Sequence, residues 1–193
     1  MTSWTRYTEP TMPVSEVTYR RVALEDPDHA WELRCGNLVE KHPMSMWHNS
    51  LMRRLGAEIQ RQLPIREFEV ATNNARLRNS TGSYFVPDVA VIPATLLTIY
   101  SRDSRELEVY EEPLPFVAEL WSPSTGDFDL TTKVPEYQLR KDAEIWRLHP
   151  HERFVESYRL DASGSYGVIR FTRGRIRLFQ LPQVEIDLDE LYS

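Results

Sequence analysis

The feature that most constrains this chain is an apolar, strand-like stretch that carries one charged side chain. The segment "VPDVAVIP", residues 86–93, alternates as a buried β-strand does, and Asp88 is its single acid. A second stretch of this kind, "PFVAELWS" at residues 115–122, carries Glu119. A buried carboxylate is costly unless it has a hydrogen-bond partner, a cation or a metal ion. If the two strands are neighbours in a sheet, the two acids converge on one point.

The length and composition favour one globular domain. The chain has 193 residues, of which 41% are hydrophobic and 27% charged, and this is enough for a substantial core and unlike a disordered segment. The beginning of the chain has the proline-rich character of a loop. We therefore expect an N-terminal arm over residues 1–20 and a single domain over residues 21–193.

Several classes of protein are disfavoured. One cysteine, Cys35, rules out an internal disulfide and indicates a reducing compartment. No apolar run approaches the roughly 20 residues of a membrane span, and the first residues do not resemble a signal peptide, so we expect a cytoplasmic protein with no membrane contact. The net charge of −6 is not that of a general nucleic-acid binder. Arginines do cluster locally, as in residues 162–184, which contain no acid, so charge leaves DNA open as a partner.

The remaining pattern predicts an α/β (α+β) fold that is richer in strand than in helix. We expect a hairpin over residues 31–43 with Gly36-Asn37 as its turn, and a helix from Ser45 to about Leu63. Further strands are expected in "EFEVAT", "ARLR", "EIWRLHP", "FVESYRL", "YGVIRF" and "RIRLFQ", with Gly174 as a hairpin turn between the last two. A short helix is predicted over residues 131–141, and a helical turn in "DLDELY".

Two converging carboxylates repel each other, and a shared proton or a bound cation relieves this. Mg²⁺ is a hard ion that binds oxygen ligands of this kind, often together with substrate phosphate. Lys133 lies in the first turn of the predicted helix, where free N–H groups also attract anions. Two acids and a lysine at a helix start form a reasonable site for cleaving phosphodiesters.

Four segments carry a resemblance to a known family. They are "VPDVAVIP", "VAELWSPST", "DLTTKVPEYQLRKDAEIW" and the hairpin-plus-helix "RCGNLVEKHPMSMWHNSLMRRL". Together they resemble the Uma-two family of nucleases, which belongs to the PD-(D/E)xK, restriction-endonuclease-like superfamily. The resemblance covers roughly residues 20–150.

The resemblance implies a four- or five-stranded mixed sheet flanked by helices, and metal-dependent cleavage of nucleic acid. It assigns Asp88 as the first acid of the motif and Glu119 as the second. The lysine that usually follows two residues later is replaced by Trp121. Members of this family supply it from the next helix, which assigns that role to Lys133.

We therefore expect an endonuclease that hydrolyses DNA with Mg²⁺ or Mn²⁺ as cofactor. The predicted metal ligands are Asp88, Glu119 and the backbone carbonyl of Leu120, and Lys133 is predicted to assist the attacking water. His48, Glu40 and Tyr137 are secondary candidates: His48 and Tyr137 also suit packing roles, and Glu40 ends the predicted hairpin.

The sequence is also compatible with other functions. One is a catalytically inactive protein that keeps the fold as a binding or scaffolding module, which the negative charge and the displaced lysine favour. Another is a hydrolase of small phosphate esters or glycosides that uses the same carboxylates. His149 and His151 are spaced as a metal pair, but a third ligand with suitable spacing for zinc is absent. By analogy with enzymes that cut paired strands, we expect a homodimer.

Overall fold

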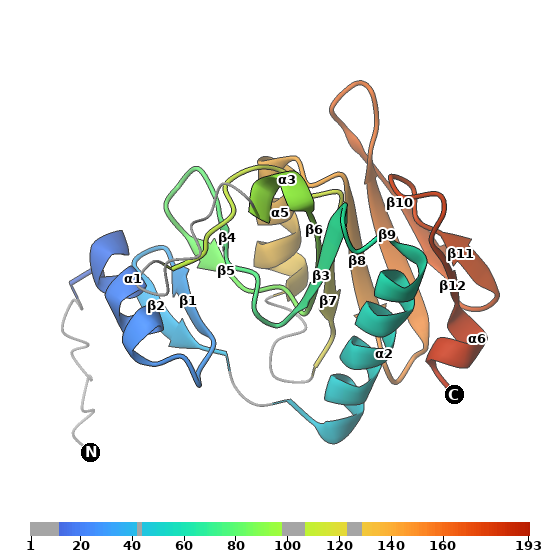
Figure 1. Ribbon diagram of the computed structural model, residues 1–193, viewed down its shortest axis with the longest axis horizontal. Helices are drawn as coiled ribbons and strands as arrows, with labels where there is room; N and C mark the ends of the chain where they lie inside the picture. Colours follow the sequence, from blue (N-terminus) through green and yellow to red (C-terminus); the bar gives the residue numbers. More distant parts are fainter. Residues whose placement is uncertain (1–11, 42–43, 98–106, 123–128) are drawn as a thin grey trace, which may run out of the picture.

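A six-stranded sheet forms the centre of the protein (Figure 1). The computed structural model describes residues 12–41, 44–97, 107–122 and 129–193, so most of the Ser-Pro-Ser-Thr motif lies outside the described residues. The strands are β3 (Phe68–Thr72), β6 (Val89–Pro93), β7 (Phe116–Leu120), β8 (Glu144–His149), β9 (Phe154–Leu160) and β10 (Tyr166–Phe171), in the order β10-β9-β8-β7-β6-β3. The resemblance implied four or five strands. The β9–β10 hairpin lengthens the sheet beyond that number.

Strand direction follows from the connections along the chain. Only β7 and β8 pair in parallel within this sheet, and the segment between them contains α5 (Val134–Arg140), as a parallel crossover requires. The other pairs in the sheet are antiparallel. The predicted mixed sheet flanked by helices is confirmed.

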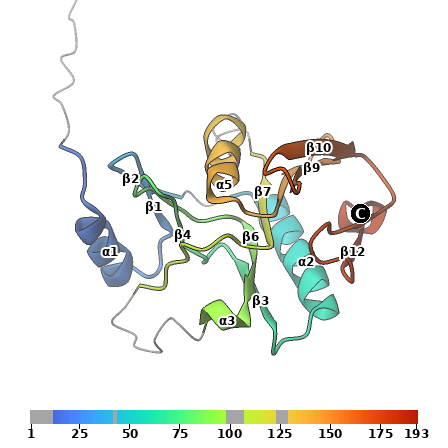
Figure 2. The same ribbon diagram turned by 90° about the horizontal axis from the view of Figure 1, so that it is seen from above.

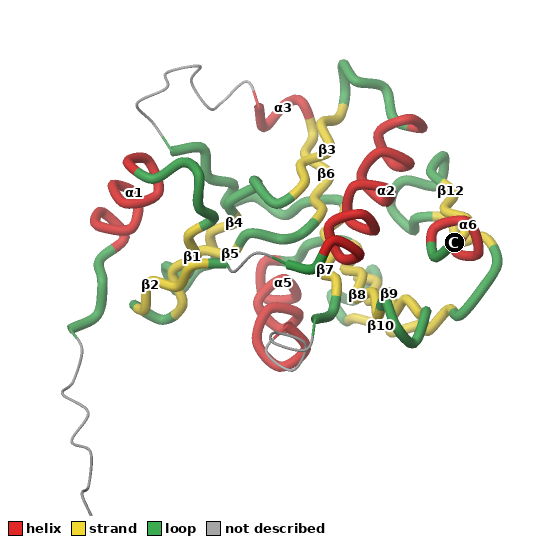
Figure 3. Tube along the Cα trace, turned by 90° about the horizontal axis from the view of Figure 1, so that it is seen from below, coloured by secondary structure: helices red, strands yellow, loops and turns green. Residues whose placement is uncertain are grey.

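Helices cover both faces of this sheet. Figures 2 and 3 show α2 (Met46–Gln62) on one side of β7 and α5 on the other. Alternation along β7 divides the core accordingly: Phe116, Ala118 and Leu120 pack in the cluster that contains α2, whereas Val117 packs with α5. Glu119 shares the face of Val117, and its carboxylate meets α5. A carboxylate therefore lies between sheet and helix, where apolar side chains are normally found.

Smaller units stand at the two ends of the sheet (Figure 1). At one end are α1 (Glu16–Glu25) and a four-stranded sheet of β1 (Trp31–Arg34), β2 (Asn37–Glu40), β4 (Leu77–Arg78) and β5 (Tyr84–Phe85). At the other end are β11 (Arg175–Arg177), β12 (Glu185–Asp187) and α6 (Leu188–Leu191). A short helix, α3 (Ala94–Leu97), follows β6. Among the described residues, no helix is long and apolar enough to cross a membrane.

Part of the stretch expected to be an N-terminal arm is helical. Helix α1 begins at Glu16, inside the stretch expected to be an arm, and Tyr19 and Ala23 are buried. The helix is anchored because these two side chains pack with Leu33 and Tyr84 of the small sheet. The division into an arm and one domain stays a prediction.

Two turn predictions were wrong in detail. The first hairpin turns at Cys35-Gly36, because Arg34 pairs with Asn37 and both turn residues have positive φ, at 48° and 79°. Gly174 does not join two strands of one hairpin. Strand β11 pairs with β12 in a separate sheet, although Gly174 does have a positive φ of 78°.

The stretch at residues 86–93 is not one continuous strand. Tyr84 and Phe85 belong to β5 of the small sheet, and β6 of the central sheet begins only at Val89. Pro87 lacks the N–H that a ladder needs and stands in the break between them. Asp88 therefore lies immediately before β6, at the point where the chain passes from one sheet to the other.

The two predicted helices near the site form as expected, with one addition. Helix α2 begins after Ser45, whose hydroxyl accepts a hydrogen bond from the backbone N–H of His48 at 3.2 Å. A π-helical segment, Asp129–Lys133, precedes α5, and Pro135 lies in the first turn of α5. Lys133 therefore stands at the junction of the two helical segments, before the first turn in which we expected it.

Candidate active site

Asp88 is fixed at the start of β6 by contacts from three directions. Its Oδ2 accepts a hydrogen bond from the backbone N–H of Leu120 at 2.7 Å, and its Oδ1 accepts one from Nζ of Lys41 at 2.7 Å. Nε2 of His48 lies 3.3 Å from Oδ2. Burial raises the pKa of Asp88, but Lys41 and His48 outweigh this and hold the pKa well below its usual value. Asp88 is thus an ionised, buried carboxylate.

Glu119 is held by α5 and the π-helical segment before it, on the side of β7 away from α2. Its Oε1 accepts a hydrogen bond from Nζ of Lys133 at 3.1 Å and another from the hydroxyl of Tyr137 at 2.6 Å. All three side chains are almost completely buried. The structure thus brings Lys133 and Tyr137 to Glu119.

The register of β6 against β7 relates the two acids. Val89 of β6 pairs with Ala118 of β7, so the next facing positions of the two antiparallel strands are Asp88 and Glu119. The hydrogen bond from the backbone N–H of Leu120 to Asp88 links the two strands just beyond their last paired residues. The two lone acids therefore lie at the adjoining ends of β6 and β7.

A third buried acid, Glu32 on β1, belongs to the same cluster. Its Oε1 accepts from the backbone N–H of Val86 at 2.9 Å and lies 3.1 Å from Nζ of Lys133, and Arg34 donates to its Oε2. Burial raises the pKa of Glu32, but Lys133, Lys41 and Arg34 lower it more, so its pKa lies below the ordinary value. Sequence reasoning missed Glu32, although "WELR" shows the same signal of one acid among apolar neighbours.

Lys41 was also missed by sequence reasoning. Besides Asp88 it donates to the backbone carbonyl of Val86 at 2.9 Å, and its side chain is 6% exposed. In the sequence it stands beside Glu40 and His42 and resembles an ordinary surface lysine. Only the folding of the first hairpin against the start of β6 brings it inward.

His48 connects α2 to the ends of the two strands. Its Nε2 lies 3.1 Å from the carbonyl oxygen of Leu120 as well as 3.3 Å from Asp88, so this nitrogen carries a proton and donates to both. Burial lowers the pKa of His48, but the hydrogen bond and charge of Asp88 raise it more, and the pKa lies above its ordinary value. His48 therefore holds two of the predicted metal-binding groups.

Glu40 and Trp121 lie at the margin of this cluster. Glu40 is partly exposed and lies 3.8 Å from Nε2 of His29. It lines the same cavity as Asp88. Trp121 stacks on the ring of His149 with a centroid distance of 4.2 Å. The side chain that replaces the usual lysine thus packs against β8, and a lysine from the following helical segment contacts Glu119.

The oxygen donors of this cluster suit a hard divalent ion. Asp88, Glu119 and the carbonyl of Leu120 offer carboxylate and carbonyl oxygens at adjoining strand ends, which is the donor chemistry of Mg²⁺ sites. Lys41 pairs with Asp88 and Lys133 with Glu119, and His48 hydrogen-bonds to Asp88 and to the carbonyl of Leu120. Among the described residues no group of three His, Cys, Asp or Glu side chains forms a metal cage, and this includes His149 with His151. The donor set fits an ion held by two acids and a backbone carbonyl.

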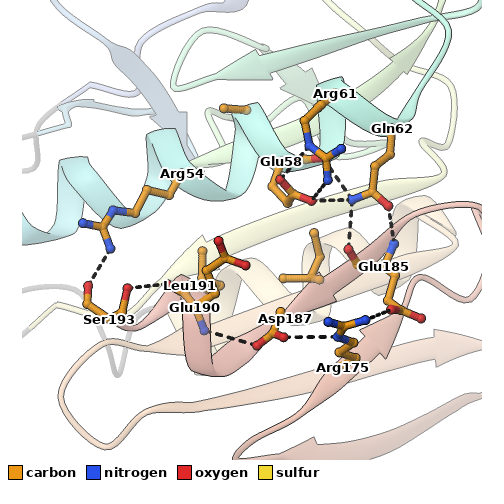
Figure 4. A pocket seen from close by; sticks show the side chains of 12 residues that line it. Arg54, Glu58, Arg61, Gln62, Arg175, Glu185, Asp187, Glu190, Leu191 and Ser193 are labelled. Carbon is orange, nitrogen blue, oxygen red and sulfur yellow. Dashed lines mark hydrogen bonds and ion pairs between the residues drawn. The ribbon is translucent and has the colours of Figure 1, made fainter.

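Two cavities differ in their relation to this cluster. A cavity of about 300 Å³ is lined by Lys41, His48 and Asp88. A larger one, of about 610 Å³, lies between α2 and the C-terminal segment and contains none of the predicted residues (Figure 4). Several of its charges are paired with one another, as in Arg61 with Glu58 and Arg175 with Asp187. The smaller cavity is therefore the one connected to the candidate site.

The mixed sheet, and the buried acids at its adjoining strand ends, define a restriction-endonuclease-like fold. The family model Uma2, described as "Putative restriction endonuclease", matches residues 17–189, and the chain therefore belongs to this family. This is the Uma-two family to which the sequence segments pointed, and the predicted family is confirmed.

One solved structure supports the fold. It is the crystal structure of a "putative nuclease belonging to DUF820" from Anabaena variabilis, with a TM-score of 0.70 and 15% identity. The match covers 84% of this chain and 89% of that chain. A comparison with curated proteins gives no match.

Proposed function

We propose that this protein is an Mg²⁺- or Mn²⁺-dependent endonuclease that hydrolyses phosphodiester bonds in DNA. The observation that carries the proposal is the position of Asp88 and Glu119 at adjoining strand ends, with Lys133 bonded to Glu119. Membership of the Uma2 family supports nuclease chemistry in general.

Asp88, Glu119 and the carbonyl oxygen of Leu120 would hold the ion. When bound, the ion supplies positive charge that polarises the scissile phosphate and favours ionisation of an attacking water. Lys133 orients this water or offsets the charge that develops on the phosphate in the transition state. Glu119 and Glu32 hold its ammonium in place, at 3.1 Å each.

The surrounding side chains keep these groups in position. Tyr137 donates to Glu119, which limits the orientation of that carboxylate. His48 donates to the carbonyl of Leu120 and so fixes the third ligand. We assign His48 and Tyr137 positioning roles, because each acts through a predicted metal ligand.

Cleavage of labelled DNA tests the proposal. We expect the wild-type protein to cut in the presence of Mg²⁺ or Mn²⁺ and to stop when a chelator is added. Asp88→Asn and Glu119→Gln remove the charge of one ligand each and should abolish cutting. Glu25→Gln removes an exposed carboxylate of α1 and serves as the matched control. Equal cutting by the wild type and both site variants would refute the proposal.

A second candidate function has one observation in its favour. Lys41 and His48 neutralise Asp88, and Lys133 neutralises Glu119, so the acids are balanced by the chain itself. This arrangement also suits a binding or scaffolding module without catalysis. Calorimetry with Mn²⁺ separates the two, since an enzyme should bind the ion in an Asp88-dependent manner and an inactive module should not.

The substrate and the assembly state are part of the proposal. Double-stranded DNA presents two scissile strands, and a homodimer would offer one site to each. Sedimentation of the protein with and without DNA measures this. A monomer under both conditions would leave the cleavage proposal intact and refute the dimer.

A further inference from the structure

Two residues that line the cavity beside Asp88 each carry a buried polar atom for which the described residues supply no partner. In the described part of the chain, four buried side-chain atoms lack a hydrogen bond, namely Nδ1 of His48, Nε of Arg76, Nε2 of Gln60 and Nε of Arg147. Two of these four, those of His48 and Arg76, belong to residues that line this cavity. An unpaired buried polar atom costs about 1–3 kcal/mol, so such atoms call for a ligand or water.

The wall of this cavity is rich in hydrogen-bonding groups. Three asparagines, Asn49, Asn73 and Asn74, line it together with the cations Lys41 and Arg76. The acids Asp28, Glu40 and Asp88 also belong to its wall. An amide offers both a donor and an acceptor, which matches the edge of a nucleobase. The cations match the oxygens of a phosphodiester.

The position of the cavity relates it to the candidate site. Asp88 and His48 form a wall common to both, and Lys41 contacts Asp88 at 2.7 Å. A ligand in the cavity therefore lies next to the first predicted metal ligand. Its volume of about 300 Å³ limits the ligand to a unit of about one nucleotide.

We propose that this cavity is a subsite for one nucleotide of the substrate strand, next to the scissile phosphate. Arg76 and Lys41 contact the phosphate, and the exposed Asn73 and Asn74 contact the sugar or base. The proposal rests on the proposed nuclease function and specifies how the strand is held. Because the pocket takes one nucleotide, the strand must be unpaired or locally opened at this point.

Binding measured without cleavage tests the subsite. The probe is a fluorescently labelled single-stranded DNA of about 12 nucleotides, followed by polarisation in the presence of EDTA. We expect Arg76→Gln and Asn74→Ala each to raise the Kd for this DNA about tenfold, because each variant loses about one hydrogen bond to the nucleotide. The matched controls are Arg173→Gln and Asn37→Ala, which alter exposed residues that do not line the cavity.

The outcomes separate the subsite from the catalytic proposal. Wild-type affinity in both cavity variants, or an equal loss in the controls, overturns the subsite even if the protein cuts DNA. The expected pattern of Kd values without any cutting supports the subsite and refutes catalysis. Displacement of the probe by inorganic phosphate at equal concentration would identify a simple anion site and overturn the nucleotide assignment. Asn74 is exposed, so Asn74→Ala keeps the test valid if Arg76→Gln fails to fold.

Discussion

Asp88 accepts a hydrogen bond from the backbone N–H of Leu120 at 2.7 Å, and this contact ties the start of β6 to the end of β7. The acid also pairs with Lys41 at 2.7 Å in a setting where both side chains are almost fully buried. Asp88 therefore has a structural role in addition to the proposed one in metal binding.

We predict that Asp88→Ala lowers the free energy of unfolding by about 3 kcal/mol, because it leaves the Lys41 ammonium buried without its counter-charge. Asp88→Asn keeps an acceptor for the Leu120 N–H and should cost less. Urea denaturation of both variants and of the wild type measures the difference. An unchanged midpoint in Asp88→Ala would show that the pair contributes nothing to folding.

The stability of the protein should fall in acid. The pKa values of Asp88 and Glu32 lie below their usual values of 3.8 and 4.5, so both groups bind fewer protons when folded than when unfolded. Their contribution to the free energy of unfolding is complete at a pH above those usual pKa values. It is lost as the pH falls towards the lower pKa values of the folded state. His48 has the opposite sign: its raised pKa stabilises the fold below its usual 6.5, and this is lost as the pH rises through the raised value.

We therefore expect the free energy of unfolding to decline steeply below about pH 4.5 and to decline gently on the alkaline side of the His48 titration. Urea titrations between about pH 3 and pH 8 measure both limbs. Asp88→Asn should flatten both limbs, because it removes the acid and the partner that raises the pKa of His48. Asp142, whose pKa is raised by burial, works against the acid limb in both proteins, and the comparison cancels it. Parallel pH curves for the two proteins would contradict the assignment.

Lys133 bridges Glu119 and Glu32, and its removal should be costly. We predict that Lys133→Met destabilises the protein by about 3 kcal/mol, since two buried carboxylates lose a shared cation. Glu32→Gln in the Lys133→Met background should recover part of this loss. A double-mutant cycle by urea denaturation gives the coupling energy. Strictly additive effects of the two substitutions would show that the bridge contributes no coupling.

A bound ion should stabilise the folded state. If Mg²⁺ or Mn²⁺ binds at Asp88, Tm should rise by about 4 °C at a tenfold excess over Kd. Lys41→Gln should enlarge this shift at fixed ion concentration, because the ammonium on Oδ1 of Asp88 no longer competes. Asp88→Asn should abolish it. A smaller shift in Lys41→Gln than in the wild type would mean that Lys41 assists the ion instead of competing with it.

The sequence by itself determined the two lone acids and the strands that begin or end beside them. Asp88 and Glu119 each stand alone among apolar residues, and the cost of burying a charge made both conspicuous. The spacing of apolar residues likewise determined α2, and Ser45 marked its beginning. These signals are local, because periodicity and capping depend only on neighbours along the chain.

Tertiary structure decided which groups surround those acids. Lys41 and Glu32 come from the first hairpin and His48 from α2, far from Asp88 and Glu119 in sequence, and no local pattern specifies that they meet there. The break at Pro87 between two sheets, and the place of Trp121 against β8, depend equally on packing between distant segments. A buried charge interacts with the groups that lie near it in space. Those distances are set only when the helices and the smaller sheet pack against the central sheet.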